Sequence, residues 1–404
     1  MSDALSQPGL GTLHDLLVRH VDAGRLPGLV ALVAKGDDVH VDTIGTLAFT
    51  DSTPMARDSI FRIASMTKPI TAVTAMSLVE EGVITLDQPI DDLVPELANR
   101  RVLRAIDVEL DDTVPARRAI TVEDLLSFRM GFGLVMAEPG SVPIQRAEDA
   151  AVLRSIGRPP WPPVPHDVDS WIAALGALPL MYQPGERWMY NTGAQVLGVV
   201  IARATGSDLP TVMRERVFEP LGMHDTGFSV PSGKLERFTT FYVPDDDTGG
   251  MTVIDDPATS WWSTPPTFPD GSGMLVSTLD DYWSFASMMR ARGAGRDGTR
   301  VLKAETVDLM TTDRLTSPQR ATTDAFLAPH AGWGLGMEAP ATDAAPDAPP
   351  PCGFGWDGGS GTTWRSNRTL DVTGILLTQR AMTSPQPPEV FDDFWRGVNA
   401  AALG

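Results

Sequence analysis

The chain has 404 residues, of which 42% are hydrophobic and 21% charged, so its composition excludes a disordered chain and its length allows two closely packed domains. The formal net charge of −20 argues against nucleic acid and anionic membrane surfaces as partners. The single cysteine, Cys352, excludes an intrachain disulfide.

The N-terminal sequence argues against export. Residues 1–8 contain neither the basic segment nor the apolar segment of a secretory signal. No apolar run in the sequence reaches the ~18 residues that a bilayer span requires. We therefore expect a cytoplasmic protein that does not enter a membrane.

The first predicted elements are a helix and a β-hairpin. Residues 10–23 predict an amphipathic helix because their leucines recur on one side. The apolar run 28–34, the turn 35–38 and the alternating run 39–44 predict the hairpin.

A long apolar helix is predicted to begin at Ser65-Met66-Thr67-Lys68. A serine three residues before a lysine places hydroxyl and amine on one face of a helix, one turn apart. Serine is a weak nucleophile until a base takes its proton, and lysine serves as that base when its pKa is lowered by burial or by nearby positive charge. The positive end of the helix dipole adds to this effect. Ser65 and Lys68 are therefore a candidate nucleophile and base.

The middle of the chain predicts helices separated by Pro-rich connections. Residues 121–126 begin with a capping-box pattern, and Gly193–Ala204 form an apolar helical run. The Pro-rich segment 158–165 excludes regular structure and is expected to be a surface loop.

The C-terminal part returns to strands. In chain order it predicts a helix at 277–290, an exposed Pro/Ala-rich loop at 338–351, strands at 362–365 and 371–380, and a last helix at 388–402. Strands near both ends predict an α/β fold with one sheet built from both termini and an inserted, mainly helical domain. We assign residues 1–85 and 264–404 to the sheet domain and 86–263 to the inserted domain, with the active site at their interface.

Two further segments contain groups that suit catalysis. Tyr190 lies in a loop rich in Pro, Gly and Asn, and a phenol near a lysine can shuttle a proton. An ordinary half-buried tyrosine is the alternative. Residues 353–362 are Gly-rich and lead into a strand, so their N–H groups can polarise a carbonyl, and a simple turn is the alternative.

Other chemistries find little support in the sequence. The chain has no Gly-x-Ser-x-Gly elbow, no His-Glu-x-x-His and no calcium-loop, dinucleotide or phosphate-loop pattern. We therefore expect no metal and no cofactor.

Taken in order, these clusters resemble the motifs of the serine β-lactamase and penicillin-binding protein superfamily, closest to its class C-like branch with the family VIII carboxylesterases. Ser65-Met66-Thr67-Lys68 resembles the first motif and Tyr190-Asn191-Thr192 the second, Tyr-x-Asn. Gly355-Trp356-Asp357-Gly358 stands where the third, Lys-Thr-Gly or a variant, is expected. Supporting similarities lie at 81–87, 218–223 and 273–278. The resemblance covers nearly the whole chain and implies a β-lactamase/transpeptidase-like fold with an antiparallel sheet.

The resemblance also implies an acyl-enzyme mechanism without metal or cofactor. Ser65 would attack a carbonyl, and Lys68 and Tyr190 would share the general base and acid roles. Which of these two takes the first proton stays open. The backbone N–H groups of Ser65 and Gly359 would form the oxyanion hole. The other candidate substrate-binding residues are Trp356, Gly358 and Thr192.

Two departures from the family pattern bear on the substrate. Thr192 stands at the position of the Asn in the second motif. In an alternative register Asn191 matches that Asn, and Tyr190 then no longer matches the motif's Tyr. The spacing from Pro184-Gly185 favours the register that uses Tyr190. Trp356 replaces the cation that would bind the carboxylate of a β-lactam. Both changes resemble the esterase branch.

We therefore expect a serine carboxylesterase that acts on small-molecule esters with small to medium acyl chains. A β-lactamase, a D-amino-acid amidase or peptidase, or an acyltransferase with the same site is the alternative among enzymes, and an inactive binding relative is the alternative outside them. The sequence predicts no oligomeric state. The aromatic residues expected to line an acyl or alcohol pocket are Phe132, Trp161, Trp188, Trp261, Trp262 and Trp356.

Overall fold

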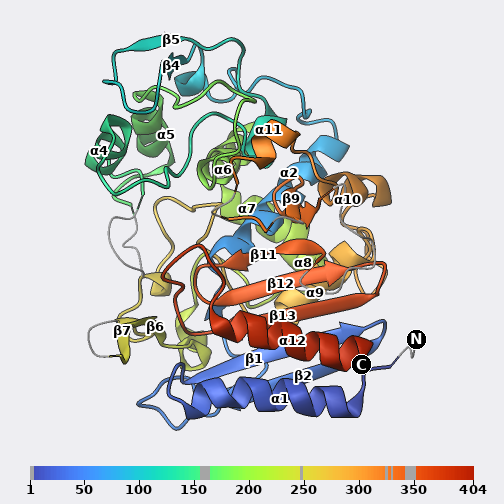
Figure 1. Ribbon diagram of the computed structural model, residues 1–404. Coiled ribbons are helices and arrows are strands. Elements are labelled where there is room, and N and C mark those ends of the chain that lie inside the picture. Colours follow the sequence, from blue (N-terminus) through green and yellow to red (C-terminus); the bar gives the residue numbers. More distant parts are fainter. Residues whose placement is uncertain (1–3, 155–163, 246–248, 324–325, 329–330, 342–351) are drawn as a thin grey trace.

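The structure, a computed structural model, is built around an antiparallel sheet (Figure 1). It describes residues 4–154, 164–245, 249–323, 326–328, 331–341 and 352–404. Within this part of the chain the sheet has seven strands in the order β2-β1-β13-β12-β11-β10-β9. Strand β1 pairs with β2 on one side and with β13 on the other, so both ends of the chain build one sheet, as predicted.

The described helices and strands have the following bounds. The α-helices are α1 (Gln7–Asp22), α2 (Thr67–Glu80), α3 (Val122–Leu126), α4 (Pro143–Ala150), α5 (Val168–Gly176), α6 (Thr192–Thr205), α7 (Leu209–Met213), α8 (Glu219–Leu221), α9 (Leu279–Arg290), α10 (Ala304–Met310), α11 (Ser317–Arg320) and α12 (Glu389–Leu403). The strands are β1 (Gly28–Lys35), β2 (Asp38–Gly45), β3 (Phe61–Arg62), β4 (Arg101–Leu103), β5 (Thr113–Pro115), β6 (Phe241–Pro244), β7 (Met251–Asp255), β8 (Val276–Ser277), β9 (Ala331–Trp333), β10 (Glu338–Pro340), β11 (Phe354–Gly358), β12 (Thr362–Asn367) and β13 (Val372–Thr378). Short turns of 3-10 helix are η1 (Ala64–Met66), η2 (Pro95–Leu97), η4 (Ser232–Arg237) and η5 (Trp261–Ser263), and η3 (Arg214–Phe218) is a π-helical turn.

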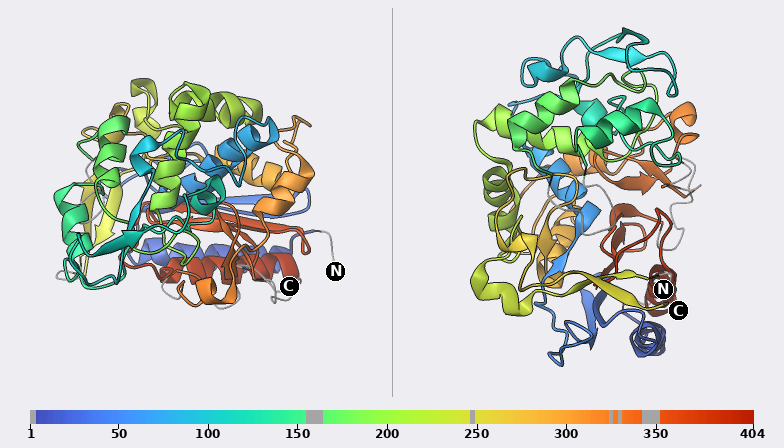
Figure 2. Two further views of the ribbon diagram at one scale, coloured as in Figure 1. Left: turned by 90° about the horizontal axis from the view of Figure 1, so that it is seen from above. Right: turned by 90° about the vertical axis from the view of Figure 1, so that its left-hand side faces the viewer.

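The two faces of the sheet are covered by different helices. Side chains alternate across β1, so Leu29, Ala31 and Val33 pack in the cluster formed with α1 and α12. Val30 and Leu32 point to the larger core, which contains residues of α2, α6 and α9. Both faces of β1 are therefore buried, which explains its continuous apolar run. Figures 1 and 2 show α1 and α12 side by side along one face of the sheet.

The described segment between strands β2 and β9 of the sheet is mainly helical, with three short strand pairs, β3–β8, β4–β5 and β6–β7. Its core is continuous with the core of the sheet, because Val196 of α6 belongs to the same buried cluster as Val30 of β1. The assignment of residues 1–85 with 264–404 to one domain and 86–263 to the other stays a prediction.

Most of the predicted elements are present. The hairpin is β1–β2, the helix predicted at 10–23 is α1, and the two C-terminal strands are β12 and β13. The capping box is found at α3, where Thr121 and Asp124 bond each other's backbone N–H groups. Helices α6, α9 and α12 match the remaining helical predictions.

The long apolar helix predicted to begin at Ser65-Met66-Thr67-Lys68 is α2, which begins at Thr67, and Ser65 lies just before it in the 3-10 turn η1. Two predictions of local structure were wrong. Residues 338–340, expected in an exposed loop, form strand β10, because Glu338 pairs with Trp333 and Gly355 of neighbouring strands. The Gly-rich stretch, expected as a turn or loop, contains strand β11. Residues 155–163 and 342–351, which include most of two predicted loops, lie outside the described residues.

None of the described helices is by itself both long and apolar enough to cross a bilayer. The bent pair Thr192–Thr205 and Leu209–Leu221 together has the length and composition of a span.

The close contact of α1 with α12 predicts opposite effects for two glycines of α1. A Cβ at Gly9 would lie 2.2 Å from the carbonyl oxygen of Ala400, whereas a Cβ at Gly11 would meet no atom within 4 Å. We expect Gly9→Ala to lower the free energy of unfolding by about 1–3 kcal/mol, because the helices must separate. Gly11→Ala should raise it by ~0.5–1 kcal/mol through helix propensity. Urea titration measures both, and equal effects would contradict the packing.

Candidate active site

The Ser65 hydroxyl and the Lys68 amine meet at the head of α2. Ser65 Oγ and Lys68 Nζ are 2.8 Å apart. The three-residue spacing crosses the junction between η1 and α2, which keeps both side chains on one face. Ser65 is half-buried and lines a cavity, whereas Lys68 is only 1% exposed. The arrangement gives a ligand access to the hydroxyl while the amine stays out of water.

Lys68 is held by neutral groups. Its Nζ donates a hydrogen bond to the carbonyl of Ser272 at 2.6 Å and lies 4.5 Å from the centroid of the Tyr190 ring. It forms no ion pair with any residue in the described ranges. Burial lowers the pKa of Lys68 to about 7, and the Asp270 carboxylate offsets this only in part. A substantial fraction of the amine is therefore neutral near pH 7 and able to accept a proton.

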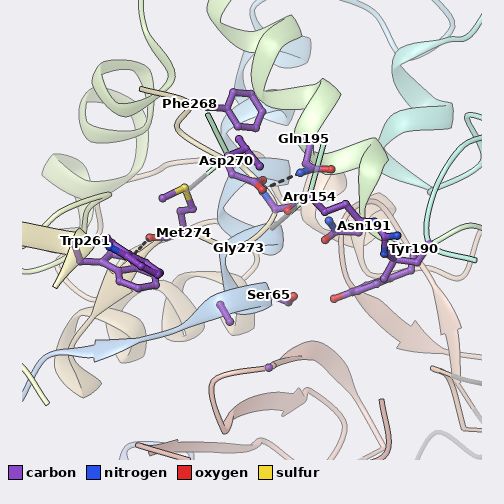
Figure 3. A pocket seen from close by; sticks show the side chains of 16 residues that line it. Ser65, Arg154, Tyr190, Asn191, Gln195, Trp261, Phe268, Asp270, Gly273 and Met274 are labelled. Atoms are coloured by element: carbon purple, nitrogen blue, oxygen red, sulfur yellow. Dashed lines mark hydrogen bonds between the residues drawn. The ribbon is translucent and has the colours of Figure 1, made fainter. Parts of the chain in front are cut away.

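Tyr190 approaches the same point from the loop before α6. Its hydroxyl accepts a hydrogen bond from Trp356 Nε1 at 2.8 Å. Figure 3 shows the hydroxyls of Ser65 and Tyr190 pointing toward one another. Burial raises the pKa of Tyr190 well above its usual value, and hydrogen bonds with Ser65 and Trp356 offset this only in part. The phenol therefore keeps its proton at neutral pH.

Two residues beside these side chains have strained backbones. Ala64, immediately before Ser65, has φ of 40°, and Asn191, immediately after Tyr190, has φ of 86°. Positive φ is uncommon for residues other than glycine, and residues with such strained backbone cluster at functional sites. Both residues also line the cavity of Ser65. The strained backbone thus marks the same place as the side-chain geometry.

The loop that supports Lys68 was not predicted from the sequence. Asp270 Oδ1 accepts a hydrogen bond from the backbone N–H of Ser272 at 2.7 Å, and Oδ2 accepts one from Gln195 Nε2 at 2.9 Å. Thr71 Oγ1 donates to the carbonyl of Gly271 at 2.6 Å, which ties the loop to α2. Asp270 stands three residues before the stretch 273–278 that resembles the family, and this was the signal available in the sequence.

The third predicted segment lies beside Ser65, but only one of its candidate residues lines the cavity. Gly359 lies in the turn between β11 and β12 and lines the cavity together with Ser65. The turn is held against the chain before Ser65, because Ser360 Oγ donates to the carbonyl of Arg62 and Thr362 Oγ1 donates to that of Ile63. The other predicted substrate contacts, absent from the lining, are Trp356, Gly358 and Thr192.

Trp356, Gly358 and Thr192 lie outside the lining of the cavity and have other contacts in the structure. The indole of Trp356 is 4% exposed and bonds the Tyr190 hydroxyl. A Cβ on Gly358 would lie 2.3 Å from the carbonyl oxygen of Ile63, so glycine is needed where this strand approaches the chain before Ser65. Thr192 is buried at the start of α6, and Asn191 and Gln195 line the cavity beside it.

The cavity of Ser65 has a volume of about 350 Å³ (Figure 3). Much of its wall is apolar or aromatic, formed by Leu134, Val164, Trp261, Trp262, Phe268 and Met274. Of the aromatic residues predicted from the sequence, Trp261 and Trp262 line it, Phe132 is buried in the core, and Trp161 lies outside the described residues. The described residues contain no group of three or more His, Cys, Asp or Glu side chains placed to bind a metal ion.

Comparisons with known proteins identify the family of the chain. The sequence model of the beta-lactamase family matches residues 13–392. Protein Rv1367c of Mycobacterium tuberculosis is 40% identical over 369 residues, which cover 89% of this chain and 87% of that protein. Esterase EstB of Burkholderia gladioli is 29% identical over 385 residues, which cover 90% of this chain and 88% of the esterase.

A solved structure shows the same fold. EstCE1, described as a hydrolase with promiscuous acyltransferase activity, superposes with a TM-score of 0.76 at 22% identity, covering 96% of this chain and 99% of EstCE1. The predicted β-lactamase/transpeptidase-like fold is therefore confirmed. The chain belongs to the beta-lactamase family and has the fold of its serine hydrolases.

Proposed function

We propose that this protein is a serine carboxylesterase that cleaves esters of small to medium acyl chains through an acyl-enzyme intermediate. The observation that carries the proposal is the 2.8 Å contact between Ser65 Oγ and a buried Lys68 amine whose pKa is about 7. The similarity to Esterase EstB over 90% of the chain supports an ester as the substrate.

In the proposed acylation step, neutral Lys68 takes the proton of Ser65 as the serine oxygen attacks the ester carbonyl. We assign the first proton to Lys68 because burial favours its neutral form, whereas burial keeps Tyr190 protonated. The N–H groups of Ser65 and Gly359 would stabilise the oxyanion. The bond between the acyl carbon and the alcohol oxygen then breaks, and Tyr190 gives its proton to the leaving alkoxide and regains one from Lys68.

In the proposed deacylation step, water attacks the acyl carbon and gives its proton to the same Lys68–Tyr190 pair. The bond to Ser65 Oγ breaks, the serine regains a proton, and the carboxylic acid leaves. Trp261 and Phe268 line the cavity beside Ser65, so an apolar acyl chain would lie against them. The cavity volume of about 350 Å³ suits a small or medium acyl group.

The assignment of the nucleophile predicts the effect of Ser65→Ala. This variant should lose at least ~10³-fold in kcat for p-nitrophenyl butyrate, because no other hydroxyl replaces the attacking atom. Mass spectrometry of the intact protein treated with a fluorophosphonate should place the adduct on Ser65 and find none in Ser65→Ala. Ser232→Ala, which removes an exposed hydroxyl elsewhere, should retain activity and labelling. Activity or labelling retained in Ser65→Ala would refute the nucleophile.

The lowered pKa of Lys68 predicts the pH profile. Ester kcat/KM should rise with pH through about 7, because the amine must be neutral to take the serine proton. The Asp270 carboxylate raises the pKa of Lys68, so Asp270→Asn should move this rise to lower pH while preserving an acceptor for the Ser272 N–H. Asp280→Asn, which removes an exposed charge bonded to Arg57, should leave the profile in place. A shift to higher pH in Asp270→Asn would contradict the assignment.

The position of the phenol predicts the effect of Tyr190→Phe. This change keeps the ring contacts but removes the hydroxyl that faces Ser65 and accepts from Trp356. We expect kcat for p-nitrophenyl butyrate to fall by ~10²–10⁴-fold, since a positioned proton donor contributes about that much. Tyr242→Phe, which removes a hydroxyl that bonds the backbone N–H of Phe49 and the side chain of Thr240, is the matched control. A loss no larger than that of the control would favour the register that uses Asn191.

A further inference from the structure

A second cavity, of about 360 Å³, adjoins the Ser65 cavity. Leu134 and Tyr190 line both spaces. The ring of Tyr190 is stacked on Phe326 of the second cavity, with centroids 4.5 Å apart. The phenol assigned to proton transfer thus stands in the wall between two spaces, each large enough for part of a substrate.

Among the described residues that line this second cavity, Arg187 is the charged one and none carries a carboxylate. The chain has a net charge of −20, yet Arg187 forms no ion pair or hydrogen bond with any described residue. Its guanidinium lies instead over the ring of Tyr182, 4.5 Å from the centroid. A guanidinium stacked in this way leaves the N–H groups in its plane free to bind a carboxylate in bidentate fashion.

The lining contains a second donor without an acceptor. Trp188 is 3% exposed, and its indole N–H has no hydrogen-bond partner in the part of the chain that the structure describes. Buried polar groups are nearly always hydrogen-bonded, so such a group calls for an acceptor that is supplied from elsewhere. Arg187 and Trp188 are adjacent in sequence and both line the cavity. Together they suit an anionic group.

The chemistry of acylation decides which part of a substrate would enter this space. The leaving alkoxide receives its proton from Tyr190, so the alcohol lies on the side of the phenol. In the proposed mechanism the acyl carbonyl would lie at Ser65 and Gly359, which line the first cavity. A cavity with Tyr190 in its wall is therefore placed to receive the alcohol portion.

We propose that the second cavity binds the alcohol portion of the ester and that Arg187 and Trp188 select alcohols that carry a carboxylate. The inference rests on the proposed esterase function and specifies its substrate class: acyl esters of apolar hydroxy acids. In the reaction the ester bond to the hydroxyl oxygen breaks and the carboxylate is unchanged.

Three esters test separately whether a carboxylate is recognised on the alcohol side or on the acyl side of the substrate. The first, para-(butyryloxymethyl)benzoate, carries the carboxylate on its alcohol. The second, para-(butyryloxymethyl)benzamide, is its neutral counterpart. The third, monobenzyl glutarate, carries a carboxylate on its acyl group. We expect the wild-type protein to have a higher kcat/KM for the first ester than for the second.

The decisive variant is Arg187→Gln. It should lower kcat/KM for the benzoate ester by roughly 10- to 100-fold, the effect of losing a charge-assisted hydrogen bond, and leave the benzamide ester and monobenzyl glutarate nearly unchanged. Trp188→Phe keeps the ring and removes the N–H, so it should lower the same preference by a smaller factor. Arg19→Gln, which removes an exposed charge from α1, should change none of the three rates.

The remaining outcomes separate this inference from the proposed function. Equal losses on all three esters, or a loss confined to monobenzyl glutarate, would overturn the assignment of the second cavity. Calorimetry of para-(hydroxymethyl)benzoate with Ser65→Ala tests the site without turnover, and binding that Arg187→Gln weakens would support it. If no ester is hydrolysed but this binding persists, the esterase function fails and the anion site stands. If neither is observed, both fail.

Discussion

The burial of the Lys68 amine is the constraint on which the rest of the site depends. An ammonium group removed from water without a carboxylate partner is strongly disfavoured, so burial favours the neutral amine. Helix α2 is buried almost all round, and Lys68 is 1% exposed at its head. The carbonyl of Ser272 and the ring of Tyr190 occupy the remaining contacts. The lowered pKa on which the proposed role of Lys68 as base depends therefore follows from the packing of one helix.

The tertiary structure assembles this site from segments that are far apart in the chain. Strand β3, which leads to Ser65, pairs with β8, and this brings the loop of Asp270 beside Lys68. The turn at Gly359 is fixed by hydrogen bonds from Ser360 and Thr362 to the chain before Ser65.

Membership of the beta-lactamase family leaves the substrate undetermined, because one fold supports many reactions. Substrate choice depends on the residues that surround the reacting atoms. Here Trp356 bonds the Tyr190 hydroxyl and does not line the cavity of Ser65. Arg187 and Trp188 line the second cavity, which shares Tyr190 with the first. The proposed substrate preference therefore rests on the residues of the cavity walls and not on membership of the family.

The sequence by itself determined the features that depend on neighbours along the chain. The spacing of Ser65 and Lys68, the hairpin β1–β2 and the capping box at Thr121 involve contacts within a few residues, so their pattern is visible in one dimension. Tertiary structure alone decided the support of Lys68 by a backbone carbonyl and the strand at Glu338, which bonds Arg365 across the sheet. Backbone carbonyls have no residue signature, and strand pairing between distant segments depends on how the whole chain packs.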